Sequence, residues 1–512
     1  MSRHRSVAEL LEAVLDPGSF LSWDTRPVEV HPSADYSRQL AGAREHSGRD
    51  EAVVTGEGRL RGRRVAVIAC EFSFLAGSIG VAAAERLTSA VERATAEGMP
   101  LLASPSSGGT RMQEGTLAFL AMTKISAAIA AHKAAGLPYL VYLRHPTTGG
   151  VLASWGSQGH VTVAEPGALI GFLGPRVYEA LYDAPFPEGV QTAENLRRRG
   201  LVDAVLAPHE LPDIAERALN VLRARTERAA ELVAPENHGT DTREEDDTPA
   251  WESITRSRRN GRPGVRHLLH CAATDVLPLN GTGEGETDPG LLLALARFGP
   301  APCVLLGQDR ARQTREHPLG PDALREARRG MRIARELGLP LVTVVDTPGA
   351  ALSREAEEGG MAGQIARCLA ELVTLEAPTV AVLLGQGTGG GALALTPADR
   401  VLCAQHAWLS PLPPEGASAV MYRSSGHAAE VAEQQGVRSA ELRRNGIADR
   451  VVLEGSGATG AGEPDAADEP EEFCTRMGEA LRRELTALLA DDPNHRMTRR
   501  HQRYRNLGSG PG

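Results

Sequence analysis

The chain has 512 residues, of which 42% are hydrophobic, and its formal net charge is −10 at pH 7. This length predicts two or three domains of ordinary globular composition, and the acidic balance argues against general nucleic-acid binding. The longest apolar runs, such as residues 379–384, have the length of strands rather than the ~18 residues of a membrane span. Because Glu9 and Glu12 interrupt the apolar residues near the N-terminus, no signal peptide is indicated, and we expect a cytoplasmic location.

Cysteine and lysine usage narrows the chemistry further. The six cysteines form no CxxC pair, which favours buried apolar fillers over disulfides or zinc ligands: Cys70, Cys271, Cys303, Cys368, Cys403 and Cys474. We therefore predict no metal in this chain. Only two lysines occur, Lys124 and Lys133, so nearly all the positive charge is arginine.

The N-terminal half begins with a short helix and paired strands. Ser6 and Glu9 have the spacing of a capping box, and residues 51–80 alternate as paired strands do. A strand over 100–104 leads to the turn Ser107-Gly108-Gly109, and apolar residues at helical spacing predict a helix over 116–135. A strand over 139–143 then leads to Thr148-Gly149-Gly150, which we expect to open the next helix.

The C-terminal half repeats this order 240 residues later. A strand over 341–345 precedes the turn Thr347-Pro348-Gly349, and a helix follows through 365–373. A strand over 380–384 then leads to Thr388-Gly389-Gly390. Strands that alternate with helices indicate parallel sheets with right-handed crossovers, so the chain is predicted to contain two copies of one α/β domain.

Acidic and turn-rich segments mark the boundaries. Residues 235–250 are expected to link an N-terminal domain over 1–234 to a C-terminal domain over 251–512. Residues 454–471 are similarly rich in Gly and acidic residues. The basic stretch Arg496–Arg505 is interpreted as a solvated helix end or a subunit contact rather than a nucleic-acid site.

Glycine turns after strands can aim backbone N–H groups at a ligand oxygen. A donor fixed in this way in an oxyanion hole is worth ~3–4 kcal/mol in the transition state. Helices that begin at Val151 and Gly391 would add the positive potential of their N-termini. Any one Gly-Gly pair is compatible with simple helix–strand packing. Four turns in matching register favour two oxyanion holes, and therefore a reaction with two negative charges to stabilise.

Three competing motifs lack their required context. Residues 385–390 match GxGxxG, but no acidic residue follows ~20 positions on to bind a ribose. Residues 346–349 match the DxxG of GTPases, but the two lysines allow no phosphate-binding GxxxxGK[ST] loop. Ser106 and Ser107 stand in no GxSxG nucleophile elbow.

The two halves resemble the two subunits of acetyl-CoA carboxylase carboxyltransferase. The first half is similar to the β subunit in SPSSGGTRMQEG (104–115), HPTTGGVLAS (145–154) and AEPGALIGFLGPRV (164–177). The second half is similar to the α subunit in VDTPGA (345–350), GQGTGGGALAL (385–395), PPEGASAVMYR (413–423) and NGIADRVV (445–452). The fused order is that of acyl-CoA carboxylase β chains. This resemblance implies two tandem crotonase-like ββα-spiral domains related by internal duplication.

The resemblance also implies an activity. In this family CO2 moves from carboxybiotin, held on a separate carrier protein, to acetyl-CoA or another short acyl-CoA, and malonyl-CoA forms through enolates. Gly149 and Gly150, assisted by Gly108 and Gly109, would hold the thioester oxygen on the acyl-CoA side. The residues implied on the biotin side are Gly389 and Gly390, with Gly391, Pro348 and Gly349.

Partners follow from the same resemblance. A separate biotin carboxylase and a biotin carboxyl carrier protein are expected, with a homodimer or hexamer whose active sites lie between subunits. Arg176, Arg310, Arg312 and Arg315 are candidates for contacts to CoA phosphates, and a solvated arginine surface is the alternative interpretation.

Two departures from the family keep other functions open. The four-cysteine zinc ribbon of bacterial β subunits has no counterpart here, and Ala351–Arg354 replaces a segment that usually holds an aromatic residue with further Pro and Gly. A decarboxylase of malonyl-type thioesters and a non-catalytic scaffold are therefore alternatives, although the four glycine turns argue against a scaffold. Acyl chain length, oligomer size and pathway, whether fatty-acid or specialised-metabolite synthesis, remain open.

Overall fold

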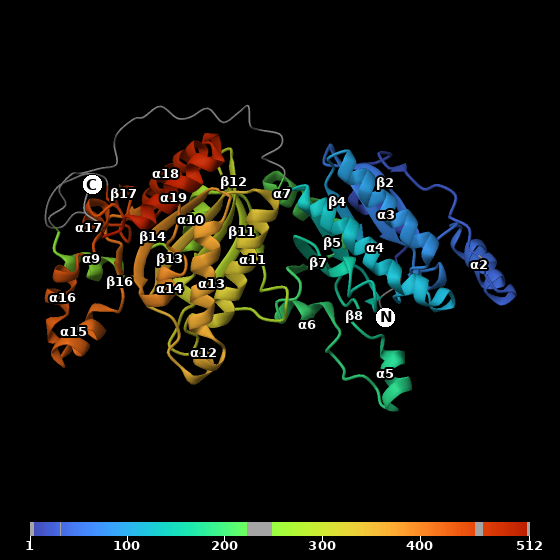
Figure 1. The fold of residues 1–512 in the computed structure, drawn as a ribbon, viewed down its shortest axis with the longest axis horizontal. Coiled ribbons are helices and arrows are strands. Elements are labelled where there is room, and N and C mark those ends of the chain that lie inside the picture. The colour runs from blue at the N-terminus through green and yellow to red at the C-terminus, as the bar shows by residue number, and fades with distance from the viewer. Residues whose placement is uncertain (1–4, 31, 223–247, 456–463, 509–512) are drawn as a thin grey trace. The chain divides into compact units, whose positions relative to one another are not determined.

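The computed structural model describes residues 5–30, 32–222, 248–455 and 464–508 (Figure 1). The chain divides into two compact units, one of residues 1–223 with 283–285 and the other of residues 224–282 with 286–512. The expected boundary at 234 and residues 235–247 of the expected linker lie outside the described residues, as do residues 456–463 of the expected Gly-rich segment. Helix α9 (Ala250–Ser257) begins at the last residue of the expected linker.

The first unit is built on a seven-stranded sheet. Its strands, in spatial order, are β1 (Leu21–Ser22), β2 (Val53–Leu60), β3 (Arg63–Cys70), β4 (Leu101–Ser104), β5 (Tyr139–Leu143), β7 (Val161–Ala164) and β9 (Ala204–Val205). The hairpin β2–β3 is antiparallel, as the alternation over 51–80 predicts, and every later neighbour is parallel. A small parallel pair, β6 (Thr147–Thr148) with β8 (Ile170–Gly171), stands apart from this sheet.

The second unit repeats this topology. Its main sheet has the order β10 (Thr274–Leu279), β11 (Leu291–Phe298), β12 (Ala301–Gln308), β13 (Leu341–Thr347), β14 (Thr379–Thr388), β15 (Arg400–Ala404) and β17 (Arg450–Val452). Strand β16 (Trp408–Ser410) pairs with the end of β14, as β8 pairs with β6 in the first unit. Again the first strands are antiparallel and the rest are parallel.

Helices join the strands in both units. Those of the first unit are α1 (Val7–Val14), α2 (Ala34–Ser47), α3 (Val81–Ala96), α4 (Gly115–Ala134), α5 (Pro175–Tyr182), α6 (Ala193–Arg198) and α7 (Leu211–Leu222). Those of the second after α9 are α10 (Val265–Ala272), α11 (Pro321–Leu337), α12 (Arg354–Glu358), α13 (Met361–Thr374), α14 (Gly389–Leu393), α15 (Pro414–Tyr422), α16 (Ala428–Gln435), α17 (Ser439–Arg444), α18 (Pro470–Ala490) and α19 (Pro493–Arg505). Helices α3 and α4 lie side by side, and so do α11 and α13 (Figure 1).

Several local predictions are confirmed. Ser6 and Glu9 form the capping box of α1, and α4 differs from the predicted helix over 116–135 by one residue at each end. By length and composition alone, the segment Met112–Ala134 is also apolar enough to cross a membrane, which the apolar-run argument did not anticipate. Its residues Ile125 and Ile129 are fully buried in the core of the first unit, where they pack with β4 and β5 residues.

The helix predicted to open at Gly150 is wrong. The chain makes turns and a short 3-10 helix over Trp155–Ser157 instead. The Ser154 hydroxyl donates to the Gly150 carbonyl at 2.5 Å, and the Gly156 amide donates to the Val151 carbonyl at 2.9 Å. These bonds take the carbonyls that a helix would use, and the chain turns inward to bury Trp155 completely.

The basic C-terminal helix is not simply solvated. Arg500 is buried in α19, where its guanidinium binds the Asp399 carboxylate at 2.5 Å and also donates to three backbone carbonyls. Arg496 is buried as well and lies 3.5 Å from the same carboxylate. These cations hold α19 against the second sheet, so the interpretation of 496–505 as a solvated helix end is wrong for both of them.

Candidate functional site

In the first unit the two predicted glycine turns touch one another. The Thr148 amide donates to the Ser107 carbonyl at 2.9 Å. A Cβ added to Gly109 would lie 3.3 Å from the Gly149 Cα, and one added to Gly149 would lie 3.2 Å from the Gly109 Cα. Both residues have positive φ, +110° and +65°. Only glycine allows this backbone conformation together with so close an approach.

The second unit builds the same pair of turns. Gly349 has φ +136° and Gly389 has φ +62°, close to the values at the equivalent positions of the first unit. A Cβ on Gly349 would lie 3.7 Å from the Thr388 side chain, so these two turns are neighbours as well. The four turns that the sequence singled out therefore form two pairs, one in each unit.

A hydroxyl closes the first turn of each pair. The Gly109 amide donates to the Ser107 hydroxyl at 3.0 Å, and the Gly349 amide donates to the Thr347 hydroxyl at 3.1 Å. Side chains that accept from an amide two residues on stabilise a tight turn without strand pairing. Because Ser107 and Thr347 are equivalent in the repeat, the duplication extends to the side chains that shape the site.

The glycine amides differ in what they bind. The Gly108 amide donates to the Ala76 carbonyl and the Gly149 amide to the Phe172 carbonyl, each at 2.9 Å. Gly150 is partly exposed, and its amide donates to no residue that the structure describes. In the second unit Gly389 and Gly390 begin α14 and are partly exposed, and their amides have no intrahelical acceptor, because intrahelical bonds begin four residues on. The parallel pairing of Thr388 with Ser410 directs the Gly389 amide to the Ser410 carbonyl, because Pro411 has no N–H to complete the pairing in the other way.

The short length of α14 limits one part of the sequence argument. This helix has five residues, and no α-helix follows Gly150 in the first unit. A macrodipole needs several aligned peptide units. The positive potential expected from apolar helices after Val151 and Gly391 is therefore absent from the first unit and small in the second, which leaves individual amides as the electropositive groups.

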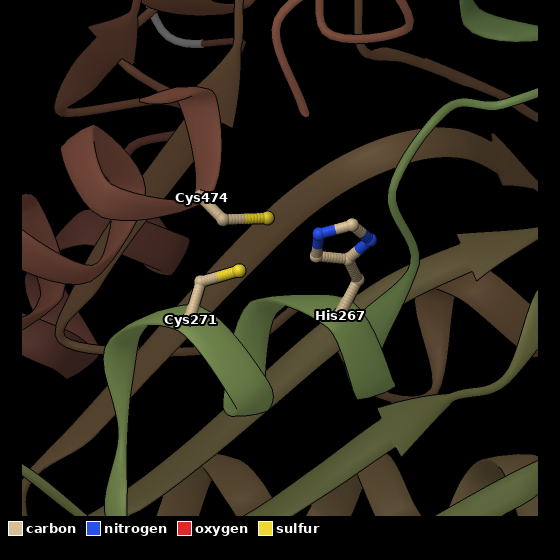
Figure 2. Close-up of side chains that lie close together, drawn as sticks. All are labelled: His267, Cys271 and Cys474. Atoms are coloured by element: carbon tan, nitrogen blue, oxygen red, sulfur yellow. The ribbon is translucent and has the colours of Figure 1, made fainter. Parts of the chain in front are cut away.

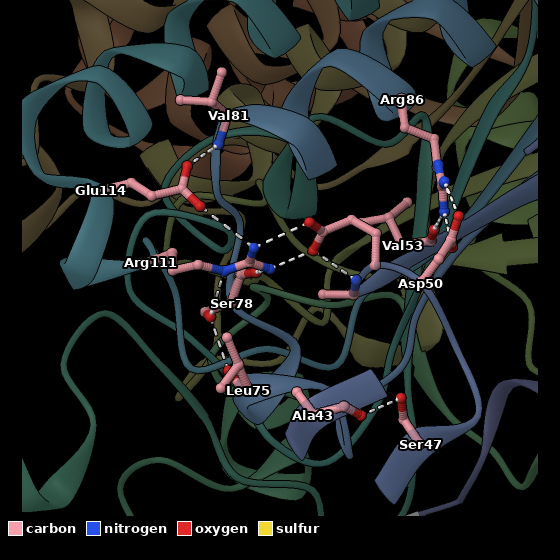
Figure 3. A network of polar contacts seen from close by, with 12 residues as sticks. Ala43, Ser47, Asp50, Val53, Leu75, Ser78, Val81, Arg86, Arg111 and Glu114 are labelled. Carbon is pink, nitrogen blue, oxygen red and sulfur yellow. Dashed lines mark hydrogen bonds and ion pairs between the residues drawn. The ribbon is translucent and has the colours of Figure 1, made fainter. Parts of the chain in front are cut away.

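A buried arginine supports the segment beside the first turn, and Figure 3 shows Arg111 with its polar partners. The Arg111 side chain is fully buried, binds both carboxylate oxygens of Glu51, and donates to the Ser78 carbonyl at 2.7 Å. Its backbone amide donates to the Ile79 carbonyl, and the Ile79 amide donates to the Gly109 carbonyl, both at 2.9 Å. Arg111 thus anchors the segment beside the Gly108–Gly109 turn.

Two glutamines play the equivalent part in the second unit. Gln308, fully buried at the end of β12, donates to the Gly391 carbonyl at 2.7 Å and accepts from the Asp346 amide at 3.1 Å. Gln313 accepts from the Thr347 hydroxyl at 2.7 Å. Sequence reasoning missed these groups and Arg111. The available signal was a single polar residue ending an apolar strand, as in APCVLLGQ at 301–308.

The candidate arginines fall into different environments. Arg310 donates to the Ser257 carbonyl at 2.6 Å and lies 4.0 Å from the buried Asp346 carboxylate beside the second pair of turns. Arg312 is exposed and lies 3.7 Å from Asp309, and Arg315 is exposed on the same segment. Arg176 lies in α5 of the first unit, and its side chain is outside the described part of the structure.

The segment that departs from the family lies next to the second pair of turns. The Ala350 amide would be 3.3 Å from a Cβ added to Gly391. Leu352 is 94% exposed, and Ser353 caps the N-terminus of α12 through its hydroxyl. Residues 351–354 therefore present an apolar side chain to solvent close to the turn formed by Pro348 and Gly349.

Comparison with known proteins identifies the family. Residues 4–503 match the family model of the carboxyl transferase domain. The chain is 61% identical to the probable biotin-dependent acyl-coenzyme A carboxylase beta3 subunit of Mycobacterium tuberculosis, over 98% of both chains. It is 36% identical to the acetyl-coenzyme A carboxylase carboxyl transferase subunits beta/alpha of Salinispora tropica, over 98% of this chain and 90% of that one.

A solved structure supports the fold. The transcarboxylase 12S crystal structure has a TM-score of 0.70 at 21% identity, over 93% of this chain and 89% of that chain. With the repeated sheet topology, this likeness confirms the predicted fold of two tandem crotonase-like domains. The resemblance found in the sequence motifs is confirmed as well: the chain belongs to the carboxyl transferase domain family, together with the β subunits of biotin-dependent acyl-CoA carboxylases.

Proposed function

We propose that this chain is the carboxyltransferase component of a biotin-dependent acyl-CoA carboxylase. It would transfer CO2 from carboxybiotin, held on a separate carrier protein, to acetyl-CoA or another short acyl-CoA. The observation that carries this proposal is the duplicated pair of glycine turns, each of which includes a partly exposed glycine, Gly150 or Gly390, whose amide can serve a ligand. Two such amide sites match a reaction that passes through two oxyanions, one on the acyl-CoA and one on biotin.

The bonding of the amides suggests separate roles for the glycines. On the acyl-CoA side, the Gly150 amide is the proposed donor to the thioester oxygen. Gly149 positions that amide, because its own N–H is bonded to the Phe172 carbonyl. Gly108 and Gly109 pack against the turn formed by Gly149 and Gly150, and a Cβ added to Gly109 would lie 3.4 Å from the Gly150 nitrogen.

On the biotin side the proposed donor to the ureido oxygen is the amide of Gly390, and Gly389 positions it as Gly149 positions Gly150, because the pairing of Thr388 with Ser410 engages the Gly389 amide. Gly391, Pro348 and Gly349 shape the neighbouring backbone, and Gln308 fixes it through the Gly391 carbonyl. Bound carboxybiotin would supply the CO2 and then the base that removes the α-proton of the acyl-CoA. The chain itself then needs only donors that are already in place, each worth ~3–4 kcal/mol in the transition state.

Two exposed arginines are the candidates for contacts to CoA phosphates. Arg312 and Arg315 are exposed cations near the second pair of turns, whereas Arg310 already donates to a carbonyl. Arg176 stays a candidate by its resemblance alone. If Arg312 or Arg315 binds a phosphate, its substitution by Gln should raise KM for the acyl-CoA and leave kcat unchanged, since the phosphates are remote from the reacting carbon.

Exposed apolar side chains support an assembly of identical subunits. Helix α4 exposes Leu117, Phe119 and Leu120 by 72%, 63% and 56%, and α15 exposes Val420 by 74%. Apolar patches of this kind mark protein interfaces. We infer a homodimer or hexamer that works with a separate biotin carboxylase and biotin carboxyl carrier protein. Sedimentation of the wild type and Phe119→Glu tests this: the charged variant should shift towards a smaller species.

Turnover of malonyl-CoA by the purified protein, with and without free biotin, tests the central proposal. Acetyl-CoA that appears only when biotin is present supports the carboxyltransferase run in reverse. Equal turnover without biotin would instead identify a decarboxylase. Methylmalonyl-CoA in a parallel reaction compares acetyl with propionyl preference, and failure of both thioesters with biotin would contradict a short-chain acyl substrate.

A further inference from the structure

Three metal-binding side chains meet between two helices of the second unit, away from the glycine turns. His267 and Cys271 lie four residues apart on α10, which places them on the same face of that helix. Cys474 comes from α18, more than 200 residues later in the chain. One donor atom from each residue lies within 4.8 Å of the other two, and Figure 2 shows the imidazole and the two sulfur atoms turned towards a common space.

The elements that carry these donors are held firmly. Helices α10 and α18 pack so closely that a Cβ added to Gly478 would lie 2.2 Å from the Cβ of Ala272. Leu268 and Leu269 on α10, and Phe473 and Met477 on α18, are buried around the contact. Cys474 is fully buried, while His267 and Cys271 are partly exposed. A small ion can therefore reach the cluster from the His267 side without separation of the helices.

The chemistry of the donors selects a class of ion. Two thiols and an imidazole, without a carboxylate, suit zinc and similar thiophilic cations and are poor ligands for magnesium or calcium. Zinc binds sulfur at ~2.3 Å and imidazole nitrogen at ~2.0–2.1 Å. These lengths draw the donors to within about 4 Å of each other, so closure from the observed arrangement needs a shift of about 1 Å.

We propose that His267, Cys271 and Cys474 form a binding site for one zinc-class divalent cation, with the fourth coordination position taken by water. Both thiols lose their protons to solvent when the ion binds, so two protons are released for each ion. The bound ion joins α10 to α18 and stabilises this corner of the second unit. The site takes no part in the carboxyl transfer, which needs no metal in the proposed mechanism.

Cobalt(II) is the probe of choice, because its thiolate complexes absorb in the near ultraviolet and its tetrahedral complexes absorb strongly in the visible. The full-length protein is treated with chelator, kept reduced, and titrated with cobalt(II) and then with zinc. We expect one equivalent of cobalt to produce both bands and one equivalent of zinc to remove them. The thermal midpoint should rise with zinc.

Matched variants assign the signal to these residues. Cys271→Ser and His267→Gln should each weaken cobalt binding by at least 10-fold and reduce the corresponding bands. Cys474→Ala is paired with Cys368→Ala, another fully buried cysteine on a helix of the same unit, and only the former should abolish binding. The thioester turnover of the wild type should be the same with and without zinc.

Two results would overturn the proposal. One is a wild-type protein that develops no cobalt–thiolate band, or whose band survives in all three ligand variants. The other is a Cys271–Cys474 disulfide that forms readily in air while the reduced protein binds no cation, which would identify a redox pair instead. Neither result bears on the carboxyltransferase proposal.

Discussion

The replacement of Gly149 by alanine tests whether contact between the two glycine turns matters for catalysis. Gly149 has φ +65°, and a Cβ there would lie 3.2 Å from the Gly109 Cα. The left-handed conformation costs an alanine ~1–2 kcal/mol, and the contact forces the turns apart by a few tenths of an ångström. Since the Gly150 amide follows directly, it would move away from the proposed thioester oxygen.

The expected loss follows from the value of one oxyanion-hole donor. Removal of such a donor lowers kcat by ~10²–10³. Displacement should cost somewhat less than removal, so we expect kcat for biotin-dependent thioester turnover to fall by about 100-fold. KM should change little, because the amide acts mainly on the oxyanion of the transition state.

Gly48 provides the matched control. It has φ +64° at the C-terminal end of α2, and a Cβ there would meet nothing within 4 Å. Gly48→Ala should therefore lose about the same ~1–2 kcal/mol of stability and retain wild-type kcat. Denaturant unfolding measures the first quantity, and steady-state kinetics with malonyl-CoA and biotin measures the second. Equal activity losses in the two variants, or full activity in Gly149→Ala, would refute the reasoning.

Three further outcomes are expected. Gly389→Ala, at φ +62°, should abolish carboxyl transfer to biotin in the same assay. Binding of the acyl-CoA, measured by calorimetry, should be unchanged in this variant. Weakened acyl-CoA binding would contradict the place of Gly389 on the biotin side. Arg500→Met leaves the buried Asp399 carboxylate without its main partner, so urea unfolding should show a loss of ~3–5 kcal/mol, against ~0–1 kcal/mol for Arg499→Met, whose side chain is 51% exposed. Burial raises the pKa of Glu326 from 4.5 to about 7, so on a rise in pH the unfolded chain loses this proton before the folded chain does. The free energy of unfolding should therefore fall by up to about 3 kcal/mol as pH rises from 4.5 to about 7. Glu326→Gln should flatten this slope, and an unchanged slope in that variant would place the titration at another group.

Local sequence patterns predicted much of the fold, because helix caps, hairpins and amphipathic helices depend mainly on residues that are close together in the sequence. The capping box of Ser6 and Glu9, the hairpin within 51–80 and the apolar spacing of α4 all appear in the structure. The helix expected after Gly150 failed because a serine hydroxyl and a buried tryptophan redirect that backbone. The serine hydrogen bond and the burial of the tryptophan leave no periodic pattern in the sequence, so residue spacing could not predict either of them.

Charged and polar residues were harder to interpret than glycines. Arg496 and Arg500 have the composition of a solvated helix end, but the carboxylate and carbonyls that bury them come from other elements. Arg111 and Gln308 support the glycine turns through bonds to residues that are distant in the chain. A single sequence contains the residues of such pairs but does not say which residues pair.

The sequence by itself determined the duplication, the four glycine turns and the family, because each is a matter of residue order and spacing. The tertiary structure alone decided that the turns meet in pairs, and that Gly150 rather than Gly149 has an amide available to a ligand. It alone brought Cys474 to His267 and Cys271, although the scattered spacing of the cysteines had predicted no metal ligands among them. Contacts of this kind depend on how helices and strands pack, and packing is a property of the whole folded unit.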